Sequence, residues 1–168
     1  DFNLAQKGFL VMDQQFVVIE KGPIEFCDLL KVSRAGIHLI HVKPETGAAL
    51  RALFAQGFVS AQLFAESETF RSKIFGGDIQ TTGRGLTPKE LKTLRSLKKR
   101  HRREMRIIFA IFDDKPTHTV AAGKTLTSEV LKGALTTFAK VDLLDRATNM
   151  RAMGYDVAVC RIKPYPKP

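Results

Sequence analysis

Cysteine and acidic side chains are scarce in this chain of 168 residues. The two cysteines, Cys27 and Cys160, lie far apart and form no CxxC pair, which argues against a disulfide scaffold and a structural zinc site. No apolar run approaches the roughly 20 residues that a membrane span needs, and the mean hydropathy is -0.09. We therefore expect a protein of the reducing cytoplasm that does not enter a membrane.

The length is that of one domain, because a chain of this size buries about 70% of its unfolded surface and can form its own core. The sequence opens at Asp1 rather than at a methionine. From this we expect residues 1–168 to be a single domain at the C-terminal end of a longer protein. Its protein partners would then be other subunits or a missing N-terminal domain.

Positive charge is concentrated in one segment. The chain has 27 Lys and Arg residues against 17 Asp and Glu residues, a net charge of +10. Residues 88–106 carry most of this excess, and their only acids are Glu90 and Glu104. Such a run neutralises phosphates and releases counterions, so we expect a basic helix that binds DNA or RNA; a solvated helix face is the alternative. The residues expected at the interface are Lys92, Arg95, Lys98, Lys99, Arg100, Arg102 and Arg103.

Hydrophobic periodicity predicts an α/β protein. Alternating runs indicate strands, three- and four-residue spacing indicates helices, and Thr87 with Glu90 forms a capping-box pattern before the basic helix. The expected strands are 9–12 and 16–20, paired as a hairpin, followed by 24–30, 37–43, 105–112 and 155–162. The expected helices are 47–64, 66–74, 88–106, 127–138 and 143–153, the last capped by Asp142. This order predicts a mixed sheet in which antiparallel strands precede a helix and a parallel strand, with helices flanking the sheet.

Two neighbouring expected strands carry side chains suited to metal-dependent chemistry. His41 and Lys43 lie two residues apart and so share one face of a strand. Antiparallel pairing can place Asp28 beside them, at the end of the sheet. Asp28 and His41 would then hold Mg²⁺ or Mn²⁺, and Lys43 would stabilise the negative charge that develops on a phosphate. The pattern predicts hydrolysis of phosphodiester bonds.

This arrangement resembles the restriction-endonuclease-like, PD-(D/E)XK superfamily, in which an acid and an x-Lys pair stand on antiparallel strands. The resemblance implies a catalytic role for Gln56, in the helix after Lys43, as in exonuclease-type members. His41 stands where the superfamily has a carboxylate, and imidazole suits Mn²⁺ better than Mg²⁺. The superfamily's further acid would be replaced by Glu20 or Glu25, although a regular strand would turn Glu25 away from Asp28.

A second resemblance covers nearly the whole chain. Residues 24–30, 39–43 and 53–61, with the closing segments 138–143 and 153–157, look like a bacterial family of sporadic distribution and unassigned function. Its members are associated with mobile elements and phage-defence loci, and they are longer at the N-terminus. The resemblance implies a nucleic-acid-acting protein of a defence system and supports an endonuclease-like core.

Two other classes of function remain open. The same fold can be a catalytically silent module that only binds DNA or RNA, having lost the carboxylate that His41 replaces. It can also be a protein-interaction module whose basic segment meets an acidic partner in a defence complex. His41 itself can equally be a packed residue of the core, in which case it binds no metal.

Overall fold

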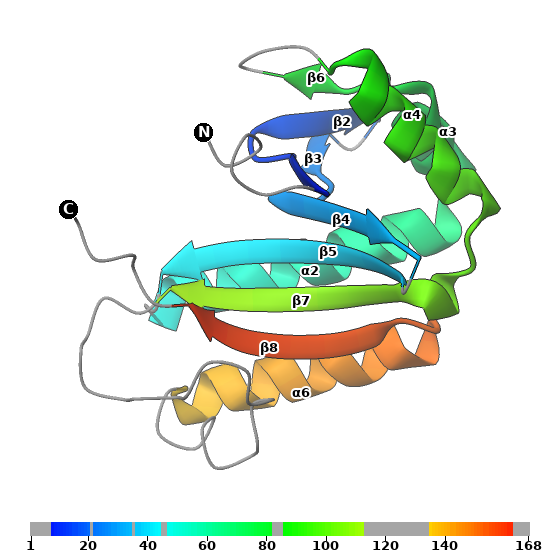
Figure 1. The fold of residues 1–168 in the computed structure, drawn as a ribbon. Coiled ribbons are helices and arrows are strands. Elements are labelled where there is room, and N and C mark those ends of the chain that lie inside the picture. Colours follow the sequence, from blue (N-terminus) through cyan, green and yellow to red (C-terminus); the bar gives the residue numbers. More distant parts are fainter. Residues whose placement is uncertain are drawn as a thin grey trace.

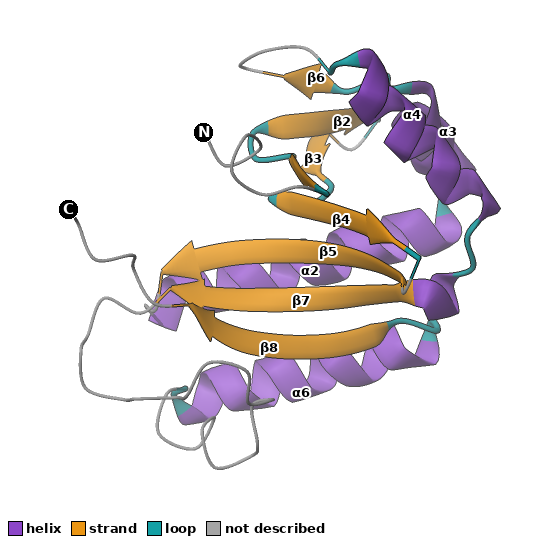
Figure 2. Cartoon of the chain, in the orientation of Figure 1, coloured by secondary structure: helices purple, strands orange, loops and turns teal. Residues whose placement is uncertain are grey.

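The computed structural model describes residues 8–20, 22–34, 36–44, 47–81, 86–112 and 135–162. The strands are β1 (Phe9–Val11), β2 (Gln15–Ile19), β3 (Gly22–Glu25), β4 (Leu29–Ser33), β5 (Gly36–Pro44), β6 (Gln80–Thr81), β7 (Met105–Phe112) and β8 (Asp156–Ile162). The helices are α2 (Gly47–Glu66), α3 (Glu68–Gly76), α4 (Pro88–Ser96) and α6 (Thr137–Ala152), with 3₁₀ turns η1 (Leu97–Lys99) and η2 (Arg102–Glu104). Figures 1 and 2 show their arrangement.

The strands form two sheets. The larger has the order β1-β4-β5-β7-β8, in which β1, β4 and β5 are antiparallel neighbours and β7 and β8 run parallel to β5. The smaller sheet has the order β3-β2-β6 and lies above the larger one in Figure 1. The predicted α/β class is confirmed, and so is the mixed sheet in which antiparallel strands precede a helix and a parallel strand.

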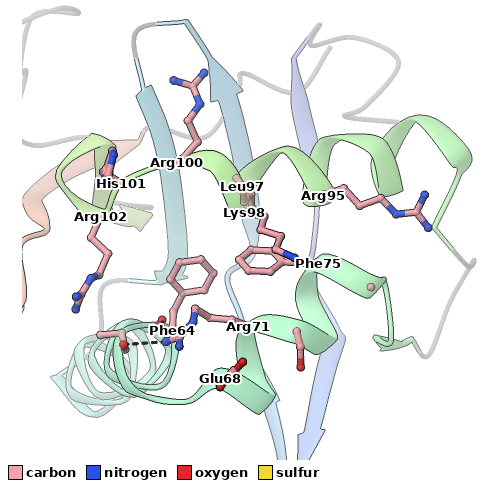
Figure 3. A pocket seen from close by; sticks show the side chains of 13 residues that line it. Phe64, Glu68, Arg71, Phe75, Arg95, Leu97, Lys98, Arg100, His101 and Arg102 are labelled. Carbon is pink, nitrogen blue, oxygen red and sulfur yellow. Dashed lines mark hydrogen bonds between the residues drawn. The ribbon is translucent and has the colours of Figure 1, made fainter.

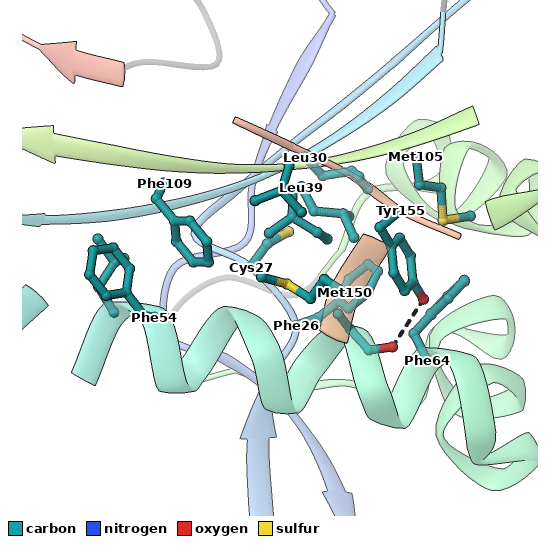
Figure 4. Close-up of a cluster of buried hydrophobic side chains, with 14 of the residues drawn as sticks. Phe26, Cys27, Leu30, Leu39, Phe54, Phe64, Met105, Phe109, Met150 and Tyr155 are labelled. Carbon is teal, nitrogen blue, oxygen red and sulfur yellow. Dashed lines mark hydrogen bonds between the residues drawn. The ribbon is translucent and has the colours of Figure 1, made fainter. Parts of the chain in front are cut away.

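Helices α2 and α6 cover the larger sheet from the same side (Figure 1). The buried side of α2 repeats at helical spacing, with Leu50, Leu53, Phe54, Ala61 and Phe64 all less than 5% exposed. These side chains join a core that extends to Met150 and Tyr155 (Figure 4). The Tyr155 hydroxyl donates a hydrogen bond of 3.0 Å to the carbonyl of Ala61, which ties the end of α2 to the sheet.

Helix α2 corrects the expectation that no apolar segment approaches the length of a membrane span. Its segment Ala48–Glu66 has 19 residues and a mean hydropathy of 1.2, enough by length and composition alone to cross a membrane. In this fold, however, the helix packs against β5, β7 and α6. Its apolar residues are therefore accounted for as the core helix of the larger sheet.

The predicted hairpin between 9–12 and 16–20 is wrong. β1 pairs with β4 in the larger sheet, whereas β2 pairs with β3 in the smaller one. The predicted strand 24–30 is likewise divided, because β3 ends at Glu25 and β4 begins at Leu29. At both places the chain crosses between the sheets. The two crossings lie side by side, with the Met12 amide donating a hydrogen bond of 2.7 Å to the Asp28 carbonyl.

The predicted basic helix 88–106 is shorter than expected. The capping box of Thr87 and Glu90 is confirmed, but α4 ends at Ser96 and two 3₁₀ turns follow before β7 begins at Met105. Arg100 between these turns is extended, with φ -103° and ψ 143°. Burial of Leu94 and Leu97 holds this segment against the core, and the extended Arg100 separates the two 3₁₀ turns that lead to β7.

The last helix begins earlier than expected. α6 starts at Thr137 with Thr136 as its N-cap, whose hydroxyl accepts a hydrogen bond from the Ala139 amide. Asp142, expected to be the cap, lies inside the helix and pairs with Arg146 at 2.8 Å. Residues 127–134 of the predicted helix 127–138 lie outside the described part of the chain.

Candidate metal site

Three carboxylates meet where the chain crosses between the two sheets. Asp13 lies in the crossing from β1 to β2, Glu25 ends β3, and Asp28 lies just before β4. One oxygen from each side chain lies within 4.8 Å of the others. Asp13 is exposed, Glu25 is half-buried and Asp28 is 6% exposed, so the group opens to solvent at Asp13.

Hydrogen bonds orient two of the three carboxylates. One Glu25 oxygen accepts from the Gln14 amide at 2.9 Å, and the other accepts from the side-chain amide of Gln56 on α2. Asp28 accepts a hydrogen bond of 2.6 Å from the backbone amide of Val42 on β5. Both sheets and α2 therefore fix the position of this carboxylate group.

The group carries unfavourable like charge. Burial raises the pKa of Glu25, and the neighbouring Asp28 and Asp13 raise it further. Burial also raises the pKa of Asp28, with an added contribution from Asp13. Lys43 lies close enough to lower the pKa of both carboxyls in part. A divalent cation would relieve this repulsion, and carboxylate oxygens are the ligands that Mg²⁺ prefers and Mn²⁺ accepts. The donor set thus fits a hard divalent metal ion.

Of the four residues that the sequence assigned to the site, the structure gathers three around these carboxylates. Asp28 is a member of the group, Gln56 bonds to Glu25, and Lys43 lies near enough to act on the charge of both acids. Lys43 is only half-buried, because it comes near the end of β5.

His41 stands apart and corrects the predicted ligand pair. Its side chain is fully buried beneath α2, its ring centroid is 6.1 Å from that of Phe109, and its Nε2 is 3.4 Å from the Ser60 hydroxyl oxygen. Burial, with a smaller contribution from Lys43, lowers the pKa of His41 to about 3, so the ring is neutral at physiological pH. A side chain enclosed in this way is a core residue, so His41 is not one of the candidate metal ligands.

Sequence reasoning missed Asp13 and discounted Glu25. Regular alternation would turn Glu25 away from Asp28, but the strand breaks between them and the side chains converge. Asp13 was assigned to a hairpin turn, and Gln14 beside it does adopt a positive φ of 58°. The sequence feature that could have indicated this carboxylate group is the position of its acids, since all three lie at breaks between apolar runs.

The seven basic residues expected at the nucleic-acid interface do not behave alike. Arg100 forms a salt bridge of 2.5 Å with Glu104 and donates a hydrogen bond of 3.1 Å to the Ser33 carbonyl. This arginine is tied to the entry into β7, and its assignment to the interface stays a prediction. The others are exposed, namely Lys92, Arg95, Lys98, Lys99, Arg102 and Arg103.

Replacing Asp13 by asparagine should stabilise the metal-free protein and weaken its response to metal. Because the pKa of Glu25 and of Asp28 is raised on folding, protonation favours the folded state, and the repulsion is felt above those pKa values. In EDTA near pH 7.5 we expect Asp13→Asn to raise the free energy of unfolding by about 0.5 kcal/mol. This stabilisation should decrease towards pH 4, where the carboxyls are protonated. Thermal melts with and without Mn²⁺ measure both effects.

Glu20→Gln is the matched control for Asp13→Asn, because Glu20 is also exposed but lies outside the carboxylate group. It should melt like the wild type and respond equally to Mn²⁺, since ligand binding stabilises only a protein that keeps its site. An equal Mn²⁺ response in Asp13→Asn and the wild type would contradict the assignment of Asp13 to the site.

Comparison with known protein families gives a match over most of the chain. The model of a family of unknown function, DUF6119, matches residues 1–163. No curated protein and no solved structure matches the chain. The match spans both sheets and every residue of the carboxylate group, so the site lies within the family domain.

Proposed function

The chain belongs to DUF6119, a family of unknown function, and we propose that it is a divalent-metal-dependent nuclease of a bacterial defence or mobile-element system. The observation that carries this proposal is the convergence of Asp13, Glu25 and Asp28, with Gln56 bonded to Glu25. Lys43 in part lowers the pKa of Glu25 and of Asp28. Acids that can hold a metal and an adjacent lysine are the groups that hydrolysis of a phosphodiester requires.

The metal would be held by Asp13, Glu25 and Asp28, with Mg²⁺ or Mn²⁺ as the ion. When bound, such an ion polarises a phosphate and favours deprotonation of water. Removal of His41 from the ligands leaves an all-oxygen donor set, which suits Mg²⁺ better than the predicted Asp–His pair.

The protein's own residues have separate roles in this proposal. The Lys43 ammonium, whose charge lowers the pKa of Glu25 and Asp28 in part, would stabilise negative charge on the phosphate as the bond to the leaving oxygen breaks. Gln56 holds Glu25, and the Val42 amide holds Asp28, so both acids are oriented before substrate arrives. These bonds spare the site the cost of ordering its side chains during the reaction.

The topology supports a restriction-endonuclease-like core. Strands β4 and β5 are antiparallel, with Asp28 just before β4 and Lys43 near the end of β5, and α2 and the parallel strand β7 follow. This is the order that the PD-(D/E)XK resemblance implies. The acid that the superfamily places two residues before the lysine would be replaced here by Glu25, which reaches the site from the smaller sheet.

DNA or RNA is the proposed substrate. The net charge of +10 favours a polyanion, and the exposed cations of residues 89–103 supply a surface for phosphates. Phosphate contacts of this kind position a nucleic acid without reading its sequence.

One observation favours a second candidate, a binding module without catalysis. His41 occupies the position two residues before Lys43 and is enclosed in the core, so no carboxylate reaches the site from β5 at that point. If Glu25 does not take over its role, the same surface would bind nucleic acid without cleaving it.

Incubation with plasmid DNA and with single-stranded RNA, in Mg²⁺, Mn²⁺ or EDTA, separates these functions. We expect cleavage that needs the metal and is lost in Asp28→Asn, which keeps an acceptor for the Val42 amide but lacks the charge. Glu20→Gln should cleave normally. Binding without cleavage under every metal condition would support the silent module, and cleavage that survives Asp28→Asn would refute the assigned site.

A further inference from the structure

A groove lies between α3 and the segment formed by α4 and η1 (Figure 3). Its volume is about 780 Å³, and its walls come from the end of α2, from α3 and from residues 95–102. Sites for small organic ligands commonly span about 300–1,000 Å³. The groove is therefore large enough to take a nucleotide.

The charge of the groove is mainly positive. Arg95, Lys98 and Arg102 line it, are exposed, and form no ion pair within the part of the chain that the structure describes. Two more arginines in the lining are already engaged. Arg71 donates to the carbonyls of Phe64 and Ala65 at 3.0 and 2.9 Å, and Arg100 pairs with Glu104. The acidic residue in the lining is Glu68.

An aromatic ring lies beside these cations. Phe75 on α3 is half-buried and lines the groove, where Figure 3 shows Lys98 reaching towards it. Its ring meets that of Phe64 edge to face, with centroids 5.9 Å apart and an interplanar angle of 89°. Phe64 is only 3% exposed and supports Phe75 from the core side. Phe75 is thus a supported ring on which a base can stack.

We propose that this groove binds one nucleotide of a single-stranded nucleic acid, with its base on Phe75 and the adjoining phosphates on Arg95, Lys98 and Arg102. An aromatic platform combined with cations that follow the backbone is the usual means of holding single strands. A duplex cannot use the platform, because its bases are stacked on one another. The inference rests on the proposed function in taking nucleic acid as the ligand.

The groove is separate from the carboxylates but connected to them by α2. Phe64 lines the groove and Gln56 bonds to Glu25, eight residues earlier on the same helix. At 1.5 Å per residue this separation is about 12 Å along the helix axis. The groove therefore holds a part of the strand away from the bond that is cut. It determines affinity and strand type, whereas the carboxylates determine hydrolysis.

Two pairs of neighbouring residues give a matched test. Lys98 and Arg102 line the groove, whereas Lys99 and Arg103 are also exposed but do not line it. Fluorescence anisotropy in EDTA with a labelled oligothymidine measures affinity without hydrolysis. We expect K98A/R102A to lose roughly tenfold or more in affinity and to lower the salt slope by about 1.4, at about 0.7 for each lost phosphate contact. K99A/R103A removes the same charge from the general phosphate-binding surface, so it should also weaken binding, but by at least about threefold less than K98A/R102A.

Phe75→Leu tests the stacking, since leucine keeps an apolar side chain in the same place. It should weaken binding of oligothymidine by about fivefold or more, while leaving an abasic oligonucleotide unaffected. Equal losses for the two charge pairs, no loss in K98A/R102A, or duplex DNA bound as tightly as the single strand would each overturn the proposal. Loss of hydrolysis in Asp28→Asn bears only on the proposed function, whereas the binding measurements in EDTA test the groove by itself.

Discussion

Replacing Lys43 by methionine is expected to lower the rate of phosphodiester hydrolysis by about 10²- to 10³-fold, the usual cost of losing one group that stabilises transition-state charge. Methionine keeps the length and apolar stem of the side chain but has no charge. Lys43 is a cation that lowers the pKa of both Glu25 and Asp28. Rates measured at saturating Mn²⁺ give the size of the effect.

The same variant separates catalysis from metal binding. Without the Lys43 charge, Glu25 and Asp28 lose a favourable neighbour, so a divalent cation should stabilise Lys43→Met at least as strongly as the wild type. Lys43→Arg, which retains the charge, should recover part of the rate. A wild-type rate in Lys43→Met would show that hydrolysis does not use this lysine.

Replacing Gly57 by alanine should destabilise the fold by about 2 kcal/mol. A Cβ at this position would lie 2.4 Å from Cε1 of Phe109 and 3.2 Å from Cδ2 of His41. Phe109 cannot move easily, because it is fully buried and meets Phe54 edge to face with centroids 5.1 Å apart. Overpacking costs about 1–3 kcal/mol, whereas alanine gains about 1 kcal/mol over glycine in a helix. Because Phe109 cannot move easily, we expect the overpacking cost to lie near the upper end of its range, about 3 kcal/mol. Subtracting the helix gain of about 1 kcal/mol leaves a net loss of about 2 kcal/mol.

Gly76→Ala is the control for Gly57→Ala, because at the end of α3 an added Cβ would meet no atom within 4 Å from the rest of the described residues, apart from its chain neighbours and its own helix. It should be neutral or stabilise by up to about 1 kcal/mol. Urea unfolding of both variants measures the difference. Combining Gly57→Ala with Phe109→Leu should cost less than the sum of the single changes, and strict additivity would contradict the proposed clash.

Local pattern was enough to predict the elements around the site. Strand β5 and helix α2 were expected at 37–43 and 47–64 and are found at Gly36–Pro44 and Gly47–Glu66. Each has a burial period that its own residues display, with alternation in the strand and three- and four-residue spacing in the helix. The parallel strand β7 was expected at 105–112, because its apolar run is nearly continuous.

Strand partners could not be predicted in the same way. β1 and β2 are close in sequence, which favours a hairpin, yet they belong to different sheets. Only contacts between distant segments, such as the pairing of β1 with β4, decide between these outcomes. The length of the basic helix depended likewise on where Leu97 is buried and on the entry into β7.

Sequence alone determined that this protein carries a basic segment and that Asp28, Lys43 and Gln56 stand on adjoining elements. The tertiary structure alone decided which acids join them, because the crossings between two sheets bring Asp13 and Glu25 to Asp28. It also decided that His41, two residues from Lys43 on the same strand, faces the core. Helix α2 covers β5 at His41, whereas Lys43, near the end of β5, stays half-buried. The order of residues in the sequence does not show which part of a strand a helix will cover.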